Sequence, residues 1–203
     1  MSLSLTDASK TIFKRQICIM KLIRISYCLL VAGLIFNTSC NKPDAVLFKD
    51  NSSAAKADKK EWTATADSET APGLENTGLA SATIDGNINT YWHTDYVAVV
   101  PYPHWIMIDM KAEKNIISVD ISNRQAATPN AVGMKRFKIE GSKDGSSFTG
   151  FGEFQFAITN SPQSFPVSSA VAYRYLKITA LEPQKAGTNH TFLAEIDVFT
   201  GRN

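Results

Sequence analysis

Residues 117–122 read Ile-Ser-Val-Asp-Ile-Ser, with apolar and polar side chains in strict alternation. Successive side chains of a β-strand point to opposite faces, so this pattern predicts a strand with one face in a core and the other in water. The same period of two continues in residues 136–140, which read Arg-Phe-Lys-Ile-Glu. Both stretches therefore favour a sheet that is half buried and half solvated.

Outward from these strands the period stays at two, and no stretch shows the apolar spacing of an amphipathic helix. Residues 105–110, Trp-Ile-Met-Ile-Asp-Met, are apolar on both sides and predict a central strand covered on both faces. The Asp-Gly pair within residues 142–146 predicts a hairpin turn, because it readily takes the positive φ values of two-residue loops. Further strands are expected at 151–158, 173–180 and 194–199. Many short strands joined by turns predict an all-β fold, a β-sandwich or jelly roll.

The N-terminal part differs from this pattern. Lys21 and Arg24 precede an apolar run of 12 residues, 25–36. A bilayer-spanning helix needs roughly 20 apolar residues, whereas a basic flank and a short apolar run are typical of a secretory signal. We therefore expect residues 1–39 to be a signal segment, with Met20 as an alternative start of the chain.

The segment that ends Phe-Asn-Thr-Ser-Cys40 resembles a bacterial lipoprotein signal, in which the cysteine is lipidated and becomes the mature N-terminus. Asn37 departs from that pattern, since Leu is usual there, and an ordinary secretory signal is the alternative. Residues 41–60 are polar and aperiodic, which predicts a flexible tether. The expected organisation is a lipid-anchored tether over 40–60 and a β-sandwich over 61–203. The resemblance implies export to the outer membrane or cell surface.

The positions of the cysteines and the net charge exclude several classes of function. Cys18 and Cys28 lie in or before the signal, so the body after Cys40 has no thiol for a disulfide, a zinc cluster or a nucleophile. From residue 40 onward, 16 Lys and Arg stand against 18 Asp and Glu, a net charge of −2. A basic footprint for nucleic acid is therefore absent.

Residues 82–93, Ala-Thr-Ile-Asp-Gly-Asn-Ile-Asn-Thr-Tyr-Trp-His, combine oxygen donors with a tight turn. Gly86 allows a sharp bend, and three side chains offer an oxygen to a hard cation: Asp85, Asn87 and Thr90. Counted from the aspartate, an EF-hand would need Gly and Glu at positions that hold Thr and Tyr, so that motif is excluded. Any further carboxylate ligand has to come from elsewhere in the chain.

Five stretches in a fixed order give the chain a family resemblance: 82–92, 104–110, 137–145, 173–178 and 194–199. Together they resemble the coagulation factor V/VIII type C, or discoidin-like, domain and its sugar-binding branch, carbohydrate-binding module family 32. The resemblance extends from Trp62 to Gly201. It implies a jelly-roll, galactose-binding-domain-like sandwich whose first and last strands are adjacent.

The resemblance also implies a structural calcium ion beside the loop that contains Asp85. Adjacent terminal strands would bring Glu195 to that loop and complete an all-oxygen set suited to Ca²⁺. The implied ligands are the carbonyl of Ala82, Asp85, Asn87, Thr90, the carbonyl of Ala194, and Glu195. The alternative is a simple Asp-Gly turn and a surface glutamate.

In the sugar-binding branch, loops at one end of the sandwich hold the ligand. The implied carbohydrate-binding residues are His93, Tyr96, Arg124, Asn130 and Phe192. A sugar site needs flat rings for the C–H face and fixed donors for hydroxyl groups, which these side chains supply. The tryptophans at 62, 92 and 105 are expected in the core, and loop 95–103 as packing and a wall of the site. The spacing of His93, His104 and His190 does not support a zinc site.

These observations predict a non-catalytic, surface-anchored protein that binds galactose-type or amino-sugar residues of complex glycans. Its only membrane contact would be the lipid anchor, and glycan-degrading or transport proteins are conceivable partners. The alternative is a protein-binding adhesin or assembly subunit without a sugar ligand. A hydrolase is not favoured, because Asp85 and Glu195 are assigned to calcium and no nucleophile–base pair is evident.

Overall fold

The computed structural model describes residues 54–75, 77–167 and 169–201. The predicted signal segment, Cys40 and most of the predicted tether lie outside these residues. Within the described part, no helix is long and apolar enough to cross a membrane. The elements are β1 (Ala54–Lys56), β2 (Thr63–Ala66), the 3₁₀ helix η3 (Ala80–Ile84), β3 (Trp92–His93), β4 (His104–Lys114), β5 (Ile116–Ser122), β6 (Met134–Ser142), β7 (Thr149–Gln155), β8 (Gln163–Pro166), β9 (Tyr173–Pro183), β10 (Phe192–Leu193) and β11 (Glu195–Gly201).

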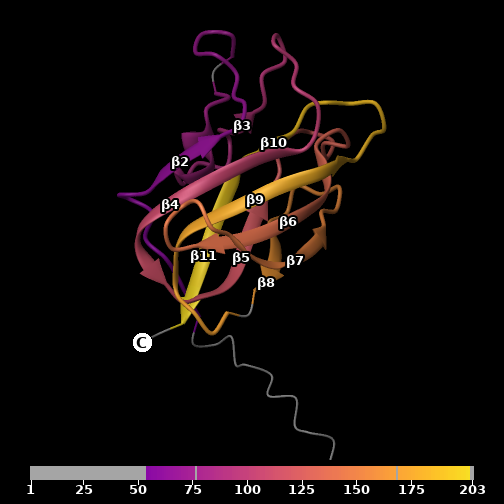
Figure 1. Ribbon diagram of the computed structural model, residues 1–203. Coiled ribbons are helices and arrows are strands. Elements are labelled where there is room, and N and C mark those ends of the chain that lie inside the picture. Colours follow the sequence, from indigo (N-terminus) through magenta and orange to yellow (C-terminus); the bar gives the residue numbers. More distant parts are fainter. Residues whose placement is uncertain (1–53, 76, 168, 202–203) are drawn as a thin grey trace, which may run out of the picture. The chain divides into compact units, whose positions relative to one another are not determined.

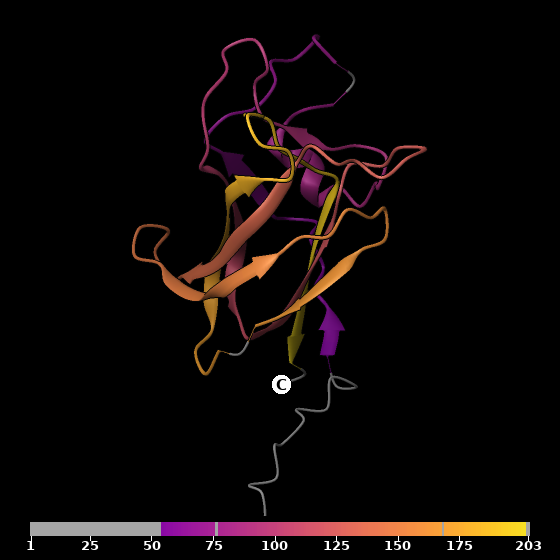
Figure 2. The same cartoon turned by 90° about the vertical axis from the view of Figure 1, so that its right-hand side faces the viewer.

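The strands form two antiparallel layers (Figures 1 and 2). One sheet has the order β2-β4-β9-β6-β7 and the other the order β1-β11-β5-β8. A short pair, β3 with β10, lies at one end of the sandwich. The all-β sandwich predicted from the period of two is confirmed.

The first and last described strands are neighbours, as the resemblance implies. Ala54 pairs with Gly201 and Lys56 with Phe199 in an antiparallel ladder. Residues 54–60 therefore belong to the sandwich. The predicted tether is too long at its C-terminal end, because its polar composition hid a short edge strand whose apolar side chains are only alanines.

The core lies between the two sheets, and alternate residues of β4 and β6 supply much of it. Ile106, Ile108 and Met110 of β4 are each 1% exposed, and Phe137 and Ile139 of β6 are fully buried. Burying one such side chain stabilises the fold by about 1.5–3 kcal/mol. Edge-to-face aromatic contacts add to this, since the ring centroid of Phe165 lies 4.8 Å from that of Phe137.

Two of the three tryptophans occupy the core, as expected. Trp62 is 7% exposed and Trp92 is 1% exposed. Trp105 was expected beside them, and this is wrong: it lies half-buried on the outer face of β4, with Lys177 Nζ 4.9 Å from its ring centroid. The outward side chains at 105, 107 and 109 are partly exposed and those at 111 and 113 fully exposed, so only the inner face of this strand is buried in the core.

The predicted hairpin turn joins β6 and β7 but is longer than two residues. Residues 143–148 form the connection, with Gly145 at φ 76°. Asp144 Oδ1 accepts hydrogen bonds from the backbone N–H groups of Ser146 and Ser147, each 2.8 Å long. The Asp-Gly pair sets the turn, while the aspartate side chain organises the longer loop.

The loops that carry the predicted site gather at the end where β3 and β10 lie, at the top of Figure 1. The C-terminal end of β11 and the beginning of β1 lie at the opposite end. The described chain therefore begins at the end of the sandwich away from the predicted sugar loops.

Candidate functional site

His93 is positioned by the short pair of strands β3 and β10. Its neighbour Trp92 faces the core, where the indole N–H donates to the carbonyl of Ser68 over 2.8 Å. Neighbouring strand residues point to opposite faces, so burial of Trp92 turns His93 toward the loops. In the ladder, His93 stands opposite Phe192.

Aromatic rings surround the imidazole of His93. Ring centroids lie 5.2 Å away for Tyr96, which is stacked, 5.0 Å for Phe192 and 5.7 Å for His190. His93 is 8% exposed and Tyr96 37% exposed, so Tyr96 forms the outer edge of the cluster. The structure thus brings His93 and Tyr96 together with His190 and Phe192, which lie far along the chain.

Arg124, just beyond β5, belongs to the same cluster. Its Cζ lies 4.3 Å from the ring centroid of Tyr91 and 5.8 Å from that of Phe192. Among the described residues, its guanidinium has no hydrogen-bond partner, although its backbone N–H donates to Asn123 Oδ1 over 2.9 Å. Stacking therefore orients the guanidinium and leaves its donors available to a ligand.

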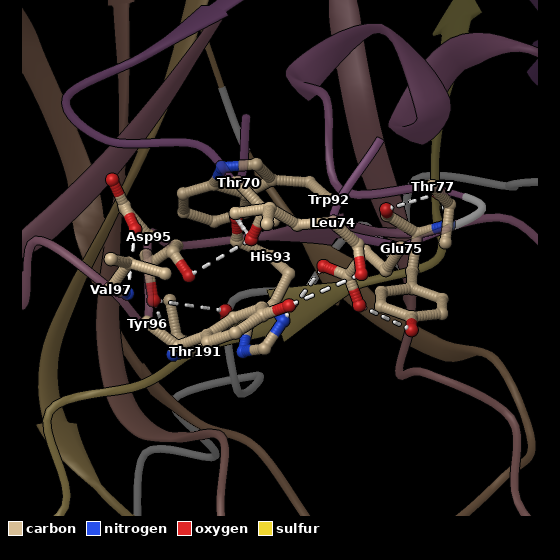
Figure 3. Close-up of polar contacts among 12 residues, drawn as sticks. Thr70, Leu74, Glu75, Thr77, Trp92, His93, Asp95, Tyr96, Val97 and Thr191 are labelled. Atoms are coloured by element: carbon tan, nitrogen blue, oxygen red, sulfur yellow. Dashed lines mark hydrogen bonds and ion pairs between the residues drawn. The ribbon is translucent and has the colours of Figure 1, made fainter. Parts of the chain in front are cut away.

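Glu75 lies beside His93 (Figure 3) and also binds Tyr91. His93 Nδ1 lies 3.0 Å from Glu75 Oε1, and the Tyr91 hydroxyl donates to Oε2 over 2.9 Å. The loop before β3 reaches this place because Gly78 exchanges backbone hydrogen bonds with residues 91 and 93. A charged carboxylate only accepts, so Nδ1 carries the hydrogen and Nε2 of a neutral His93 is an acceptor.

The ionisation of the cluster agrees with this assignment. Burial lowers the pKa of His93, and its contact with Glu75 only partly offsets this. Burial alone would raise the pKa of Glu75, but hydrogen bonds with Tyr91 and His93 lower it below its usual range. At neutral pH the pair is therefore a neutral imidazole beside a charged carboxylate.

Asn130 is the one predicted sugar contact that the structure does not join to this cluster. Its Oδ1 accepts from the backbone N–H of Val132 over 3.0 Å, and its carbonyl accepts from Asn123 Nδ2 over 3.3 Å. The described contacts give it a role in shaping the loop after β5.

Sequence reasoning missed Glu75, Tyr91 and His190. Glu75 and His93 are 18 positions apart across an irregular loop. No periodicity pairs residues across such a loop. Of these three residues, Tyr91 could most readily have been predicted as part of the site, since it directly precedes Trp92 and His93. His190 lies two residues before Phe192, with a half-buried ring whose Nδ1 has no hydrogen-bond partner among the described residues.

The loop 95–103 was expected to pack, and this is wrong for its tip. Val97 is 68% exposed, Val99 48% and Val100 42%. Asp95 Oδ1 accepts from the backbone N–H groups of Val97 and Ala98 and folds the tip outward. The base of the loop contacts the cluster through Tyr96 and through the Tyr102 hydroxyl, which donates to the carbonyl of His190 over 3.1 Å.

His104 does not join the other histidines. Its ring is fully buried between Asp67 Oδ2, at 2.8 Å from Nδ1, and the carbonyl of Asn189, at 2.7 Å from Nε2. Across the described ranges, no three His, Cys, Asp or Glu side chains converge as a metal site would require. A histidine zinc site therefore has no support.

The loop of the expected calcium site is folded around Asp85. Its Oδ1 accepts from the backbone N–H of Asn87 over 2.8 Å, and its Oδ2 lies 2.7 Å from the Thr90 hydroxyl. Thr90 Oγ1 also lies 2.8 Å from the carbonyl oxygen of Asn87. The loop thus gathers side-chain and carbonyl oxygens of the kind that Ca²⁺ binds.

Glu195 lies within electrostatic reach of that loop. Burial raises its pKa, Lys59 opposes this shift, and the charges of Asp197 and Asp85 add to it. Glu195 is 6% exposed, and its Oε2 is buried without a hydrogen-bond partner among the described residues. Its Oε1 accepts from Lys59 Nζ. An orphaned buried carboxylate oxygen fits a cation ligand, so the residues present are compatible with the expected ion.

Comparison with known proteins places this arrangement in a family. The sequence profile of the F5/8 type C domain matches residues 63–196. A sialidase from Micromonospora viridifaciens is 32% identical over 126 residues, which are 60% of this chain and 18% of the sialidase. A galactose oxidase from Gibberella zeae is 29% identical over 146 residues, which are 70% of this chain and 20% of the oxidase. The chain thus matches only about a fifth of these enzymes.

Solved structures agree in fold. A family 32 carbohydrate-binding module of Clostridium perfringens, in complex with GalNAc-β-1,3-galactose, superposes with a TM-score of 0.64 at 28% identity, over 72% of this chain and all of the module. The C-terminal domain of a Bacteroides fragilis chitobiase gives 0.63 at 30%, over 73% of this chain and all of the domain. The family 32 module of Clostridium perfringens NanJ, in complex with galactose, gives 0.61 at 25%, over 72% of this chain and 98% of the module. With the family match covering most of the sandwich, the chain belongs to the F5/8 type C domain family.

Proposed function

We propose that this protein is a non-catalytic surface lipoprotein that binds galactose-type or amino-sugar residues of complex glycans. The observation that carries the proposal is the cluster around His93 and Arg124. It combines aromatic faces, an imidazole acceptor and a guanidinium whose donors have no partner in the described chain. The relatives solved with galactose and with GalNAc-β-1,3-galactose support this ligand class.

The chemistry of the cluster suits a sugar with neighbouring hydroxyl groups. The planar fork of Arg124 can donate to two adjacent hydroxyl oxygens, while Nε2 of His93 accepts from one hydroxyl hydrogen. Tyr96 and Phe192 offer ring faces on which the apolar C–H face of a sugar packs. Donors, an acceptor and apolar walls thus meet in one place, as a small-molecule site requires.

The proposal includes a calcium ion held by the loop around Asp85 and by Glu195. Ala82, Asn87, Thr90 and Ala194 would complete the oxygen ligands. The ion would tie the loop before β3 to the beginning of β11 and supply no chemistry beyond this link. Because β11 follows β10 directly, the same link would steady Phe192.

The absence of catalysis is part of the proposal. The carboxylate at the sugar cluster and the one proposed to complete the metal site are already engaged: Glu75 by His93 and Tyr91, and Glu195 by Lys59. A glycosidase would need two carboxyl groups facing one glycosidic bond. The similarity to a sialidase and a galactose oxidase covers only a fraction of those enzymes, which agrees with an accessory binding role.

A lipid anchor at Cys40 agrees with the arrangement of the sandwich. The described chain enters through β1 at the end opposite the His93 loops (Figure 1). An anchor attached there would leave the proposed sugar loops at the end of the sandwich away from the attachment point.

A panel of immobilised glycans tests the proposed ligand class. We expect binding to glycans that end in galactose or N-acetylgalactosamine, and loss of that binding in His93→Ala. Binding to no glycan by the wild-type protein would contradict the proposal and favour the protein-binding alternative, for which the exposed valines of loop 95–103 would be the first surface to test.

A further inference from the structure

Lys59 occupies an unusual place for a lysine. Its side chain is only 9% exposed, and its ammonium contacts Glu195 Oε1, Asp197 Oδ1 at 2.7 Å and the carbonyl of Ile196 at 3.2 Å. A lysine is rarely buried unless its charge is paired. Here the pairing joins the connection between β1 and β2 to the first residues of β11.

The same glutamate is a proposed calcium ligand. One of its oxygens meets Lys59, and the other is buried without a partner in the described chain. Lys59 and Asp85 also line one surface pocket, together with Lys56, Ser81 and Gly86. Lys59 therefore holds one oxygen of a carboxylate whose other oxygen has no partner in the described chain, and it shares a pocket with the aspartate of the proposed ion loop.

We propose that Lys59 is a built-in cation that competes with calcium for Glu195. This inference rests on the calcium site proposed above. Without the ion, the ammonium neutralises the buried carboxylate. When calcium binds, like charges would lie close together around Glu195, and their repulsion moves the ammonium away.

Asp197 gives the displaced ammonium somewhere to go. It already accepts from Lys59 at 2.7 Å, while its other oxygen meets Lys56 at 2.7 Å. Lys59 can therefore release Glu195 and keep a paired charge. Because binding effects are reciprocal, the cation that weakens calcium binding is itself loosened by calcium. The ion would thereby act on the segment that leads from β1 into the domain.

Calorimetric titration with CaCl₂ tests the competition in the wild type, Lys59→Met and Lys60→Met. Lys60 is the matched control, because it is adjacent and exposed and lines the same pocket, while its side chain pairs with neither Glu195 nor Asp197 in the described chain. We expect Lys59→Met to bind calcium about 5- to 150-fold more tightly than the wild type, the usual range of such couplings. Lys60→Met should bind like the wild type. In chelator, Lys59→Met should melt at a lower temperature than Lys60→Met, because Glu195 then lacks a partner.

Equal calcium affinities of the two variants, or weaker binding by Lys59→Met, would overturn the competition and leave the calcium site standing. No calcium binding by any of the three proteins would overturn both proposals. Neither of these outcomes depends on whether the protein binds a sugar.

The displacement of Lys59 can also be measured in the wild-type protein, where the result does not depend on whether a variant folds. Amine acetylation followed by mass spectrometry should modify Lys59 slowly in chelator, where it is buried, and faster in calcium. Lys60 should react alike in both. Unchanged reactivity of Lys59 at saturating calcium contradicts the proposed displacement.

Discussion

The protonation state of His93 decides what the proposed site can recognise. Glu75 fixes the hydrogen on Nδ1, and burial keeps the ring neutral. Nε2 then accepts, and the neighbouring Arg124 donates. A sugar hydroxyl is both donor and acceptor, so two adjacent hydroxyl groups satisfy both residues at once.

Galactose affinity should therefore depend on pH. The pKa of His93 is lowered from its usual value of 6.5. Protonation turns Nε2 from an acceptor into a donor, so affinity should be constant above about pH 6.5 and fall as the pH drops below it. Folding stability should fall in the same direction, because the folded protein binds this proton less readily than the unfolded chain does.

Titrations of galactose between pH 4.5 and 8 would measure this, with circular dichroism to show that the protein stays folded. An affinity that rises on acidification would mean that the charged imidazole is the binding form, contrary to the assignment here.

Glu75→Gln tests the hydrogen bond that sets the tautomer. An amide can donate or accept, so both tautomers of His93 become available. We expect galactose affinity to fall about tenfold, the effect of losing one hydrogen bond to a charged group. Glu153→Gln, on the exposed strand β7, should leave affinity unchanged. A Glu75→Gln protein that binds like the wild type would show that tautomer control is unimportant.

Among the elements, strands with clean alternation were predictable from sequence. The stretches around Ile117 and Phe137 became β5 and β6, because a period of two with one apolar face has a single solution in a sandwich. The prediction that residues 105–110 are covered on both faces was wrong, because Trp105 and Met107 are apolar but face outward. Hydrophobicity alone does not tell an outer face shielded by lysine from a buried one.

Substitutions at a buried position and at an outward position should therefore lower the free energy of unfolding by different amounts. Phe137→Ala empties a fully buried position and should destabilise the protein by about 3–5 kcal/mol. Trp105→Ala removes a half-exposed ring and should cost about 1 kcal/mol. Urea unfolding measures both. Similar losses for the two variants would place Trp105 in the core after all.

Contacts between distant loops were less predictable than strands. The meeting of His93, Arg124 and Phe192 followed from family resemblance, whereas Glu75 and Lys59 could not be placed in advance. Their partners are 18 and 136 positions away. A side chain in an aperiodic segment carries no signal of the strand against which it will pack.

For the molecule as a whole, the proposed ion should stabilise the fold. A ligand that binds only the folded state at 100 times its Kd adds about 2.7 kcal/mol, which corresponds to a rise in Tm of about 5–10 °C for a chain of this size. Differential scanning calorimetry in calcium and in chelator measures the rise, and Asp85→Ala should abolish it. Glu113→Gln, which changes an exposed acid elsewhere, should keep it. Identical melting temperatures of the wild type in calcium and in chelator would contradict the proposed calcium site.

The two ends of the sandwich divide the proposed tasks. The described chain pairs with β11 at one end, and the loops beside β3, which carries His93, lie at the other end (Figure 1). In the proposed anchored protein, the ligand site would lie at the end of the sandwich away from the attachment point. The proposed calcium loop and Glu195 would hold the two segments that carry His93 and Phe192.

The central claim is that Arg124 and His93 bind a galactose-type sugar. Isothermal titration calorimetry with galactose tests it most directly in the wild type, Arg124→Ala and Arg174→Ala. Arg174 is the matched control, since it also lies over a tyrosine ring, with its Cζ 5.1 Å from the centroid of Tyr175, but pairs with Asp109 away from the site. We expect binding by the wild type and Arg174→Ala, and at least a tenfold loss of affinity in Arg124→Ala. No heat of binding in the wild type, or equal affinity in Arg124→Ala, would contradict it.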